Sequence, residues 1–387
     1  MSHSPSPAIE TRGALKRRIA TLQQENATLL SKMTKTPTHS YVREGRAIRR
    51  LVCLSDPVTN LIAEYDRRIM LVESEDEVNI PESNDDEERA FRSYKKLVRW
   101  CPSVKGLVQP STQGAVLAAA CQELQKGADG ARGDDANNLK SSVATWLNEQ
   151  DPSPVPLFIP TQKRGRGFDH DITGQLLCPV DYDWLDPLVR DAIRDYHPRY
   201  TITAYMWPMF LYRQSLYNAK RPSKGLFKGE LLVRAFRCIF TSPSSARDDV
   251  EHDADDADGT DNNANADNDS HPVKVRKSSQ RDVHTRTNVA TILKMRSVEP
   301  RAIAYVTVQL RFALSSRKCW GLQDDNFNYD AFYHNIVNWF EKPRSQAKAQ
   351  EVDELLLWWT RAIFGRQHAS TLNPAATENL SVELSMN

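Results

Sequence analysis

Three consecutive residues, Asp169, His170 and Asp171, carry side chains that could bind a metal ion or transfer protons, and Asp181 and Asp183 follow closely. A carboxylate beside a histidine commonly orients the imidazole. A metal site, however, needs three or four converging ligands, and the same side chains in a glycine-bounded loop cap turns and helices by accepting backbone hydrogens. We therefore expect these residues to cap turns and helices. A metal-dependent hydrolase at Asp169–Asp171 is the functional alternative that we rank last of three.

The stretch "KRGRG" at residues 163–167 could contact phosphates, with Phe168 stacking on a base. Its glycines match neither the phosphate-loop spacing nor the dinucleotide fingerprint, so solvated loop charge is the simpler interpretation. A second basic run, residues 274–281, could act as a nuclear import signal or be masked by the acidic run before it. The residues that would contact nucleic acid are Lys163, Arg164, Arg166, Lys274, Arg276 and Lys277.

Residues 14–33, "ALKRRIATLQQENATLLSKM", place apolar side chains at alternating steps of four and three, which is the pattern of a coiled coil. Leucine at position d with a β-branched residue at position a favours a parallel pair, and a buried asparagine at a fixes the register. We predict a homodimer through this seam. A single amphipathic helix docked on the chain's own body is the alternative. The seam residues are Leu15, Ile19, Leu22, Asn26, Leu29 and Met33.

The residues before the seam exclude a basic-region leucine zipper. Such a protein needs a continuous cationic helix directly before the first heptad, because that helix lies in the major groove of DNA. The upstream sequence "MSHSPSPAIETRGA" contains two prolines, a glycine and one arginine. The seam therefore predicts self-association and no DNA-reading helix.

Composition excludes several other classes of protein. The 387 residues are 40% hydrophobic and 26% charged, which is enough for a sizeable core. The net charge of +1 gives no global reason to expect nucleic acid or a membrane as partner. No apolar run approaches the roughly 20 residues of a membrane span, and the N-terminus has no apolar signal core. We expect an intracellular protein, cytoplasmic or nuclear, whose six scattered cysteines are reduced and mostly buried.

Helical periodicity recurs along the chain while strand-period runs are few, so we predict an all-α fold. In the first 150 residues, the acidic stretch 73–89 is expected as a loop and the glycine-rich "KGADGARGDD" at 126–135 as a flexible connection. The helices expected around them are 41–54, 58–72, 88–101, 113–125 and 135–150.

The C-terminal third has the strongest pattern. "SVEPRAIAYVTVQLRFALSS", residues 297–316, is apolar nearly all round and should be a central helix covered by others. Helices at 329–341 and 351–364 should follow, the second ended by Gly365. Because neighbours on a helix diverge by about 100 degrees, Trp358 and Trp359 cannot both face the core. His334 is expected to be packed among aromatic residues.

Composition also divides the chain into segments. Residues 244–286 contain an acidic run with almost no apolar side chains, which cannot offset its ordering entropy and should be disordered. The segments are 1–36, a coiled-coil helix with a disordered N-terminus; 40–150, helical; 151–243, the first part of a core; 244–286, the disordered insertion; 287–365, the helical second part; and 366–387, a disordered tail.

Several blocks in order, including "GRGFDHDITGQLLCPVDYDW", "KGLFKGELLVRAFRCIFTSPSSA", "RAIAYVTVQLRFALSS" and "LLLWWTRAIFG", resemble an uncharacterised domain-of-unknown-function family of mushroom-forming (basidiomycete) fungi. The resemblance spans about Gly165 to Gly365, apart from the acidic insertion. It implies a fungal, intracellular protein. It supplies no activity, cofactor or catalytic residue that could be transferred to positions here.

No Ser, Cys or Thr lies in a nucleophile motif, so we assign no catalytic residue, cofactor or metal ligand. The sequence instead favours a non-enzymatic helical interaction protein that dimerises through its N-terminal seam and binds an unknown protein partner, without membrane contact. The alternative is a nucleic-acid-associated nuclear protein of mobile-element origin.

Overall fold

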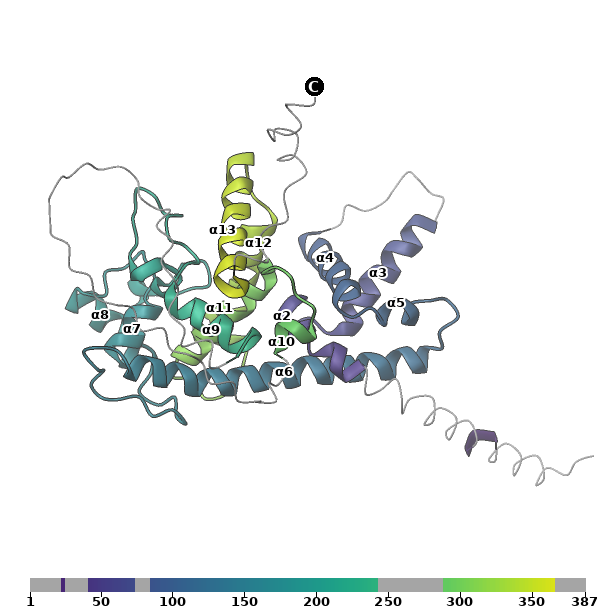
Figure 1. Cartoon of the computed structure of the whole chain (residues 1–387), viewed down its shortest axis with the longest axis horizontal. Helices are drawn as coiled ribbons and strands as arrows, with labels where there is room; N and C mark the ends of the chain where they lie inside the picture. Colours follow the sequence, from purple (N-terminus) through teal and green to yellow (C-terminus); the bar gives the residue numbers. More distant parts are fainter. Residues whose placement is uncertain (1–21, 25–40, 74–83, 243–287, 366–387) are drawn as a thin grey trace, which may run out of the picture. The chain divides into compact units, whose positions relative to one another are not determined.

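The computed structural model describes residues 22–24, 41–73, 84–242 and 288–365. This part of the chain is mainly α-helical (Figure 1). It also contains one two-stranded antiparallel sheet formed by β1 (Gln323–Asp324) and β2 (Phe327–Asn328). The expected helical class is confirmed. None of the described helices is both long and apolar enough to cross a membrane. The predicted segments 244–286 and 366–387, and all of the coiled-coil seam except Leu22, lie outside the described residues.

The described residues fold into two compact units. Those of the first unit lie within Met1–Trp207 and Glu299–Lys342, and those of the second lie within Pro208–Val298 and Pro343–Asn387. The helices of the first unit are α2 (Ile48–Leu51), α3 (Val58–Glu73), α4 (Asp85–Trp100), α5 (Val104–Leu107), α6 (Gly114–Asn148), α7 (Asp171–Leu177), α8 (Pro187–Arg194), α11 (Pro300–Leu314) and α12 (Tyr329–Glu341).

Helix α11 forms the centre of the first unit. Every residue from Arg301 to Leu314 is buried, and the helix packs against α2, α6 and α12. The buried Arg301 guanidinium is paired with Glu341, with 2.8 Å between Nε and Oε1. The prediction of a covered central helix in this segment is confirmed, because a helix that is apolar nearly all round needs neighbours on every side.

The prediction of two helices joined by a flexible glycine-rich connection is wrong, because α6 is a single helix of 35 residues. Its Gly127 packs directly on the backbone of Val42, and Gly45 packs in the same way on Leu124. At both glycines a Cβ atom would lie under 3.0 Å from a backbone carbonyl. The glycine therefore serves close helix packing, and tertiary contacts override its low helix propensity.

A buried ion pair connects three helices of the first unit. The Arg50 guanidinium on α2 makes two hydrogen bonds to the Asp135 carboxylate on α6, at 2.8 and 2.7 Å. The Tyr305 hydroxyl on α11 donates to the same carboxylate at 2.7 Å. Both charged side chains are almost fully buried, so each depends on the other for its stabilisation.

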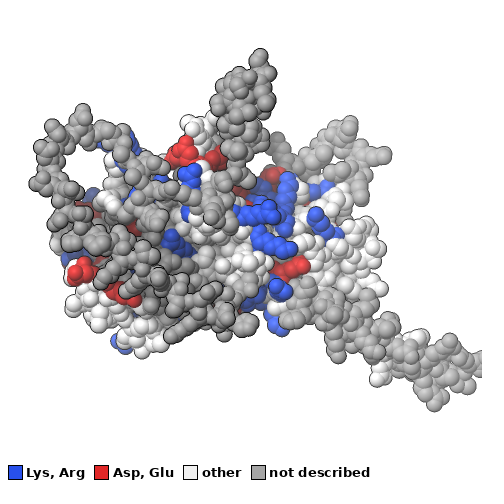
Figure 2. Space-filling view, in the orientation of Figure 1, with Lys and Arg blue, Asp and Glu red and all other residues white. Residues whose placement is uncertain are grey.

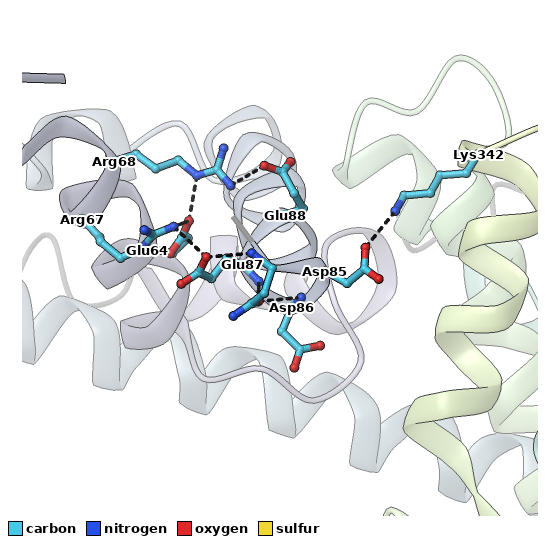
Figure 3. Close-up of polar contacts among 9 residues, drawn as sticks. Glu64, Arg67, Arg68, Asp85, Asp86, Glu87, Glu88 and Lys342 are labelled. Atoms are coloured by element: carbon cyan, nitrogen blue, oxygen red, sulfur yellow. Dashed lines mark hydrogen bonds and ion pairs between the residues drawn. The ribbon is translucent and has the colours of Figure 1, made fainter. Parts of the chain in front are cut away.

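Charged side chains also link α3 to α4 on the surface (Figure 3). Arg68 donates to Glu64 on its own helix at 2.7 Å and to Glu88 on α4 at 2.8 Å. Asn84 and Glu87 form a capping box at the start of α4. Helix α4 therefore begins earlier than predicted, because acidic residues that were expected in a loop occupy its first turn, where they interact favourably with the helix dipole.

The second unit contains α9 (Glu230–Phe240), α10 (Val289–Ile292) and α13 (Gln346–Phe364). Helices α9 and α13 pack through Phe236 and Trp359, whose ring centroids are 5.2 Å apart. Trp359 is fully buried and Trp358 half-buried, as predicted from their adjacent positions. Gly365 ends α13 with φ +79°, a backbone conformation that favours glycine. The predictions for the two tryptophans and for the end of the helix at Gly365 are confirmed, whereas α13 begins at Gln346, earlier than the predicted residue 351.

Candidate functional site

A small pocket lies in the first unit at the C-terminal end of α11. Its walls come from η1 (Gly167–Asp169), the end of α8, η2 (Pro198–Tyr200) and the turn between β1 and β2. The volume is about 120 Å³. Ligand pockets usually measure about 300–1,000 Å³, whereas a cavity of about 150 Å³ holds benzene. The pocket therefore fits one small molecule or one functional group, and not a whole nucleotide cofactor.

Local sequence features position the loops around this pocket. Gly167 adopts φ +73°, and a Cβ there would lie 3.2 Å from the backbone nitrogen of Ser316. The Asp186 side chain accepts a hydrogen bond from the backbone of Leu188, with Pro187 as the first residue of α8. This cap fixes the start of α8, because the aspartate satisfies a free backbone N–H and proline has none to leave unpaired.

The floor of the pocket carries a fixed guanidinium. Arg311 is only 4% exposed, and its central carbon lies 3.3 Å from the centroid of the Phe327 ring. Its Nη1 donates to the Tyr329 hydroxyl at 3.0 Å and lies 3.6 Å from Oδ2 of Asp324. The Tyr329 hydroxyl in turn donates to the same carboxylate at 3.0 Å. Packing and hydrogen bonding thus hold Arg311 in one orientation.

Two unpaired carboxylates lie at the rim of the pocket, whereas Arg194, a cation of the lining, is already paired with Asp171 at 2.6 Å. Asp169 and Asp325 are exposed, and neither carboxylate has an ion pair with any of the described residues. Tyr196 and Asp325 adopt φ +55° and +51°, a strained conformation for residues other than glycine that persists where the surroundings enforce it. Partial burial is the main cause that raises the pKa of the Tyr196 phenol, and the negative charges of Asp325 and Asp169 raise it further.

Two of the predicted nucleic-acid contacts are buried against the last turn of α11 and not in solvent. Lys163 is 5% exposed and Arg166 is 1% exposed. Lys163 donates to the carbonyl of Phe312, and Arg166 donates to the carbonyl of Ala313 at 2.9 Å. The interpretation of both residues as solvated loop charge or phosphate contacts is wrong, because the buried last turn of α11 requires donors for its carbonyls.

Of the remaining predicted contacts, Arg164 is exposed, and Lys274, Arg276 and Lys277 lie outside the described residues. The burial of Lys163 and Arg166 had one signal in the sequence. The last carbonyls of a helix that is covered on every side need donors where that helix ends inside the protein, and cationic side chains from elsewhere in the chain can supply them.

A sequence model of a family of unknown function, DUF6698, matches residues 126–364. The chain belongs to this family. No curated protein and no solved structure matches the chain. The DUF6698 segment starts inside α6, earlier than the Gly165 at which the resemblance was placed, and it contains every residue that lines the pocket. The expected membership of a family without an assigned function is confirmed.

Within the described part of the DUF6698 segment, Lys163 and Ser315 place an amine beside a hydroxyl, as a base and a nucleophile would require. Lys163 Nζ lies 3.4 Å from Ser315 Oγ, and burial together with Arg166 lowers the pKa of Lys163 to about 7. A neutral amine beside a hydroxyl can activate it. Here, however, both groups donate to the carbonyl of Phe312. Their hydrogen bonds therefore terminate α11.

The Asp169–His170–Asp171 stretch, also within the DUF6698 segment, caps a helix. His170 Nδ1 accepts from the backbone of Ile172 at the start of α7, and Nε2 lies 3.0 Å from the carbonyl of Pro156. The expected capping is confirmed for His170, and for Asp183, whose Oδ1 accepts a hydrogen bond from the backbone of Leu185 at 2.9 Å. Asp171 makes an ion pair with Arg194 instead, at 2.6 Å. Among the described residues, no group of three or more His, Cys, Asp or Glu side chains is arranged to hold a metal ion.

Most other reactive side chains among the described residues are buried. His334 is buried as predicted and faces Asp330 at 3.6 Å, and burial lowers its pKa to about 4. Five of the six free cysteines are buried, and Cys319 is exposed. Burial raises the pKa of Cys53 to about 12, so its reactive thiolate is not populated near neutral pH.

Proposed function

We propose that this DUF6698 member is a non-enzymatic, helical interaction protein of a fungal cell that pairs through residues 14–33. One observation supports this proposal above the others. Leu22, a d-position residue of the heptad pattern, lies on a helical turn and is 54% exposed. A seam leucine that is open to solvent in one chain is available to a second chain, whereas a helix docked on its own body would bury it.

The helical body offers a surface for a further protein. Val155, Leu157 and Ile159 are exposed, Val155 at 92%. The segment that carries them is held in place by Asn148, whose side chain makes hydrogen bonds to the backbone nitrogen and oxygen of Phe158 at 2.9 and 2.8 Å. Exposed apolar side chains on a fixed backbone are typical of interaction sites. Two linked copies would bind a partner with increased avidity.

Light scattering on the full chain tests the pairing. We expect the intact protein to have twice the monomer mass, and a chain lacking residues 1–36 to be a monomer. The double variant Leu22→Asp with Leu29→Asp should also be a monomer, because it places charges in the seam. Gln24→Asp, at the outward f position, is the matched control and should remain a dimer. A monomeric intact chain, or a dimeric double variant, would refute the proposal.

One observation favours the alternative of a nucleic-acid-associated nuclear protein. Helix α4 carries a row of cations, and Lys and Arg side chains gather over it (Figure 2). Lys96 and Arg99 are partly neutralised by Glu299, at 3.4 and 2.9 Å, while Lys95 is exposed. Retardation assays at two salt concentrations would support this alternative only if binding weakens steeply with salt and Lys95→Ala reduces it.

A further inference from the structure

The pocket at the C-terminal end of α11 presents opposite charges at two depths. Arg311 forms the floor and is more than nine-tenths buried. Its Nη1 is engaged by Tyr329 and Asp324, whereas Nε and Nη2 have no hydrogen-bond partner among the described residues and are not sealed from solvent. A guanidinium edge with two free, parallel donors matches the geometry of a carboxylate.

The carboxylates at the rim favour a positively charged group on the same ligand. Asp325, in the strained turn between β1 and β2, and Asp169, in η1, both line the pocket without an ion pair to a described residue. They would repel a ligand that carries two negative charges, such as phosphate. They would attract a cationic group placed beside a carboxylate.

The volume of the pocket limits which ligands can fit. A volume of about 120 Å³ admits a molecule of roughly benzene's size, with about six to eight non-hydrogen atoms. We propose that the pocket binds a small zwitterion of the α-amino acid class. The carboxylate would lie on Nε and Nη2 of Arg311, and the ammonium group would face Asp325 and Asp169. The apolar part of the ligand would contact the ring of Tyr200, which is also part of the wall.

The two halves of such a ligand can be tested separately on the full chain. L-alanine carries both charges, propionate lacks the ammonium group, and isopropylamine lacks the carboxylate. Titration calorimetry should show L-alanine binding about tenfold or more tightly than either analogue, because each analogue leaves one charged side of the pocket without a partner. Equal affinities for L-alanine and propionate, or no binding of L-alanine at millimolar concentration, would overturn the proposal.

Two variants test which side chain binds the carboxylate of the ligand and which binds its ammonium group. Asp325→Asn removes one of the two rim charges and keeps a residue that tolerates positive φ; it should reduce the preference for L-alanine over propionate severalfold. Arg311→Gln should abolish binding of both. Asp181→Asn, an exposed aspartate outside the pocket, is the matched control and should bind like the natural chain. If Arg311→Gln does not fold, as judged by circular dichroism, Asp325→Asn still decides the result. An Asp325→Asn variant with unchanged preference would refute the assignment.

Discussion

Gly127→Ala and Gly130→Ala, the same substitution three residues apart on α6, should change stability in opposite directions. At Gly130 an added Cβ meets no atom within 4 Å, so alanine gains helix propensity and should stabilise the first unit by about 0.5–1 kcal/mol. At Gly127 the added Cβ would collide with the backbone carbonyl of Val42. Overpacking costs roughly 1–3 kcal/mol, and a backbone atom yields less readily than a side chain, so the net effect should be destabilisation by about 1–2 kcal/mol.

Thermal unfolding of the full chain, followed by far-ultraviolet circular dichroism, measures both changes. For a unit of this size, 1 kcal/mol corresponds to about 2–4 °C in Tm, so the two variants should move to opposite sides of the natural chain. Gly133→Ala, also in open space, is a second control and should behave like Gly130→Ala. A Gly127→Ala variant as stable as Gly130→Ala would show that residues 41–45 do not pack on α6 through this glycine.

Three further predictions concern buried charges. Asp135→Asn should destabilise the first unit by about 3–5 kcal/mol in chemical denaturation, because it leaves the buried Arg50 charge unpaired; a cost below about 1 kcal/mol would contradict the burial of this pair. Because the pKa of His334 is lowered from 6.5 to about 4, the unfolded chain binds a proton in this range that the folded chain excludes. Stability should therefore fall by up to about 3 kcal/mol as pH drops from about 6.5 to about 4, and His334→Gln should remove this dependence. The pKa of Lys163 is lowered from 10.5 to about 7, so above about pH 7 the unfolded chain again binds a proton that the folded chain has lost. Stability should therefore also rise as pH increases from about 7 towards about 9. An equal rise in the Lys163→Met variant would exclude Lys163 as the source of this dependence.

The helices that the sequence predicts well are those whose side-chain pattern depends on local geometry. Residues 297–316 are apolar on every side, which only a covered helix explains, and α11 lies in this range. Asp186 and Pro187 carry a cap that needs no distant partner, and α8 begins there. The contrasting exposure of Trp358 and Trp359 follows from helix pitch alone.

The features that the sequence does not predict depend on distant contacts. Gly127 is a residue type that usually interrupts a helix. It serves helix packing here only because the backbone of Val42, which is distant in the sequence, lies directly against it. Lys163 and Arg166 lie in a glycine-rich basic stretch that is typical of a solvated loop. Their hydrogen-bond acceptors are nevertheless the carbonyls of Phe312 and Ala313, about 150 positions later in the chain. The pocket likewise joins residues near 167–202 to residues near 311–327, and no local period indicates that these segments meet.

The first unit is assembled from two stretches of chain, Met1–Trp207 and Glu299–Lys342. During synthesis on the ribosome, the leading stretch emerges without the helix that fills its centre. Translation at about 5–20 residues per second implies a delay of roughly 5–20 s before α11 is made. For that time the surfaces of α2 and α6 that later cover α11 stay open, so a nascent chain halted near Trp207 is a natural client for chaperones.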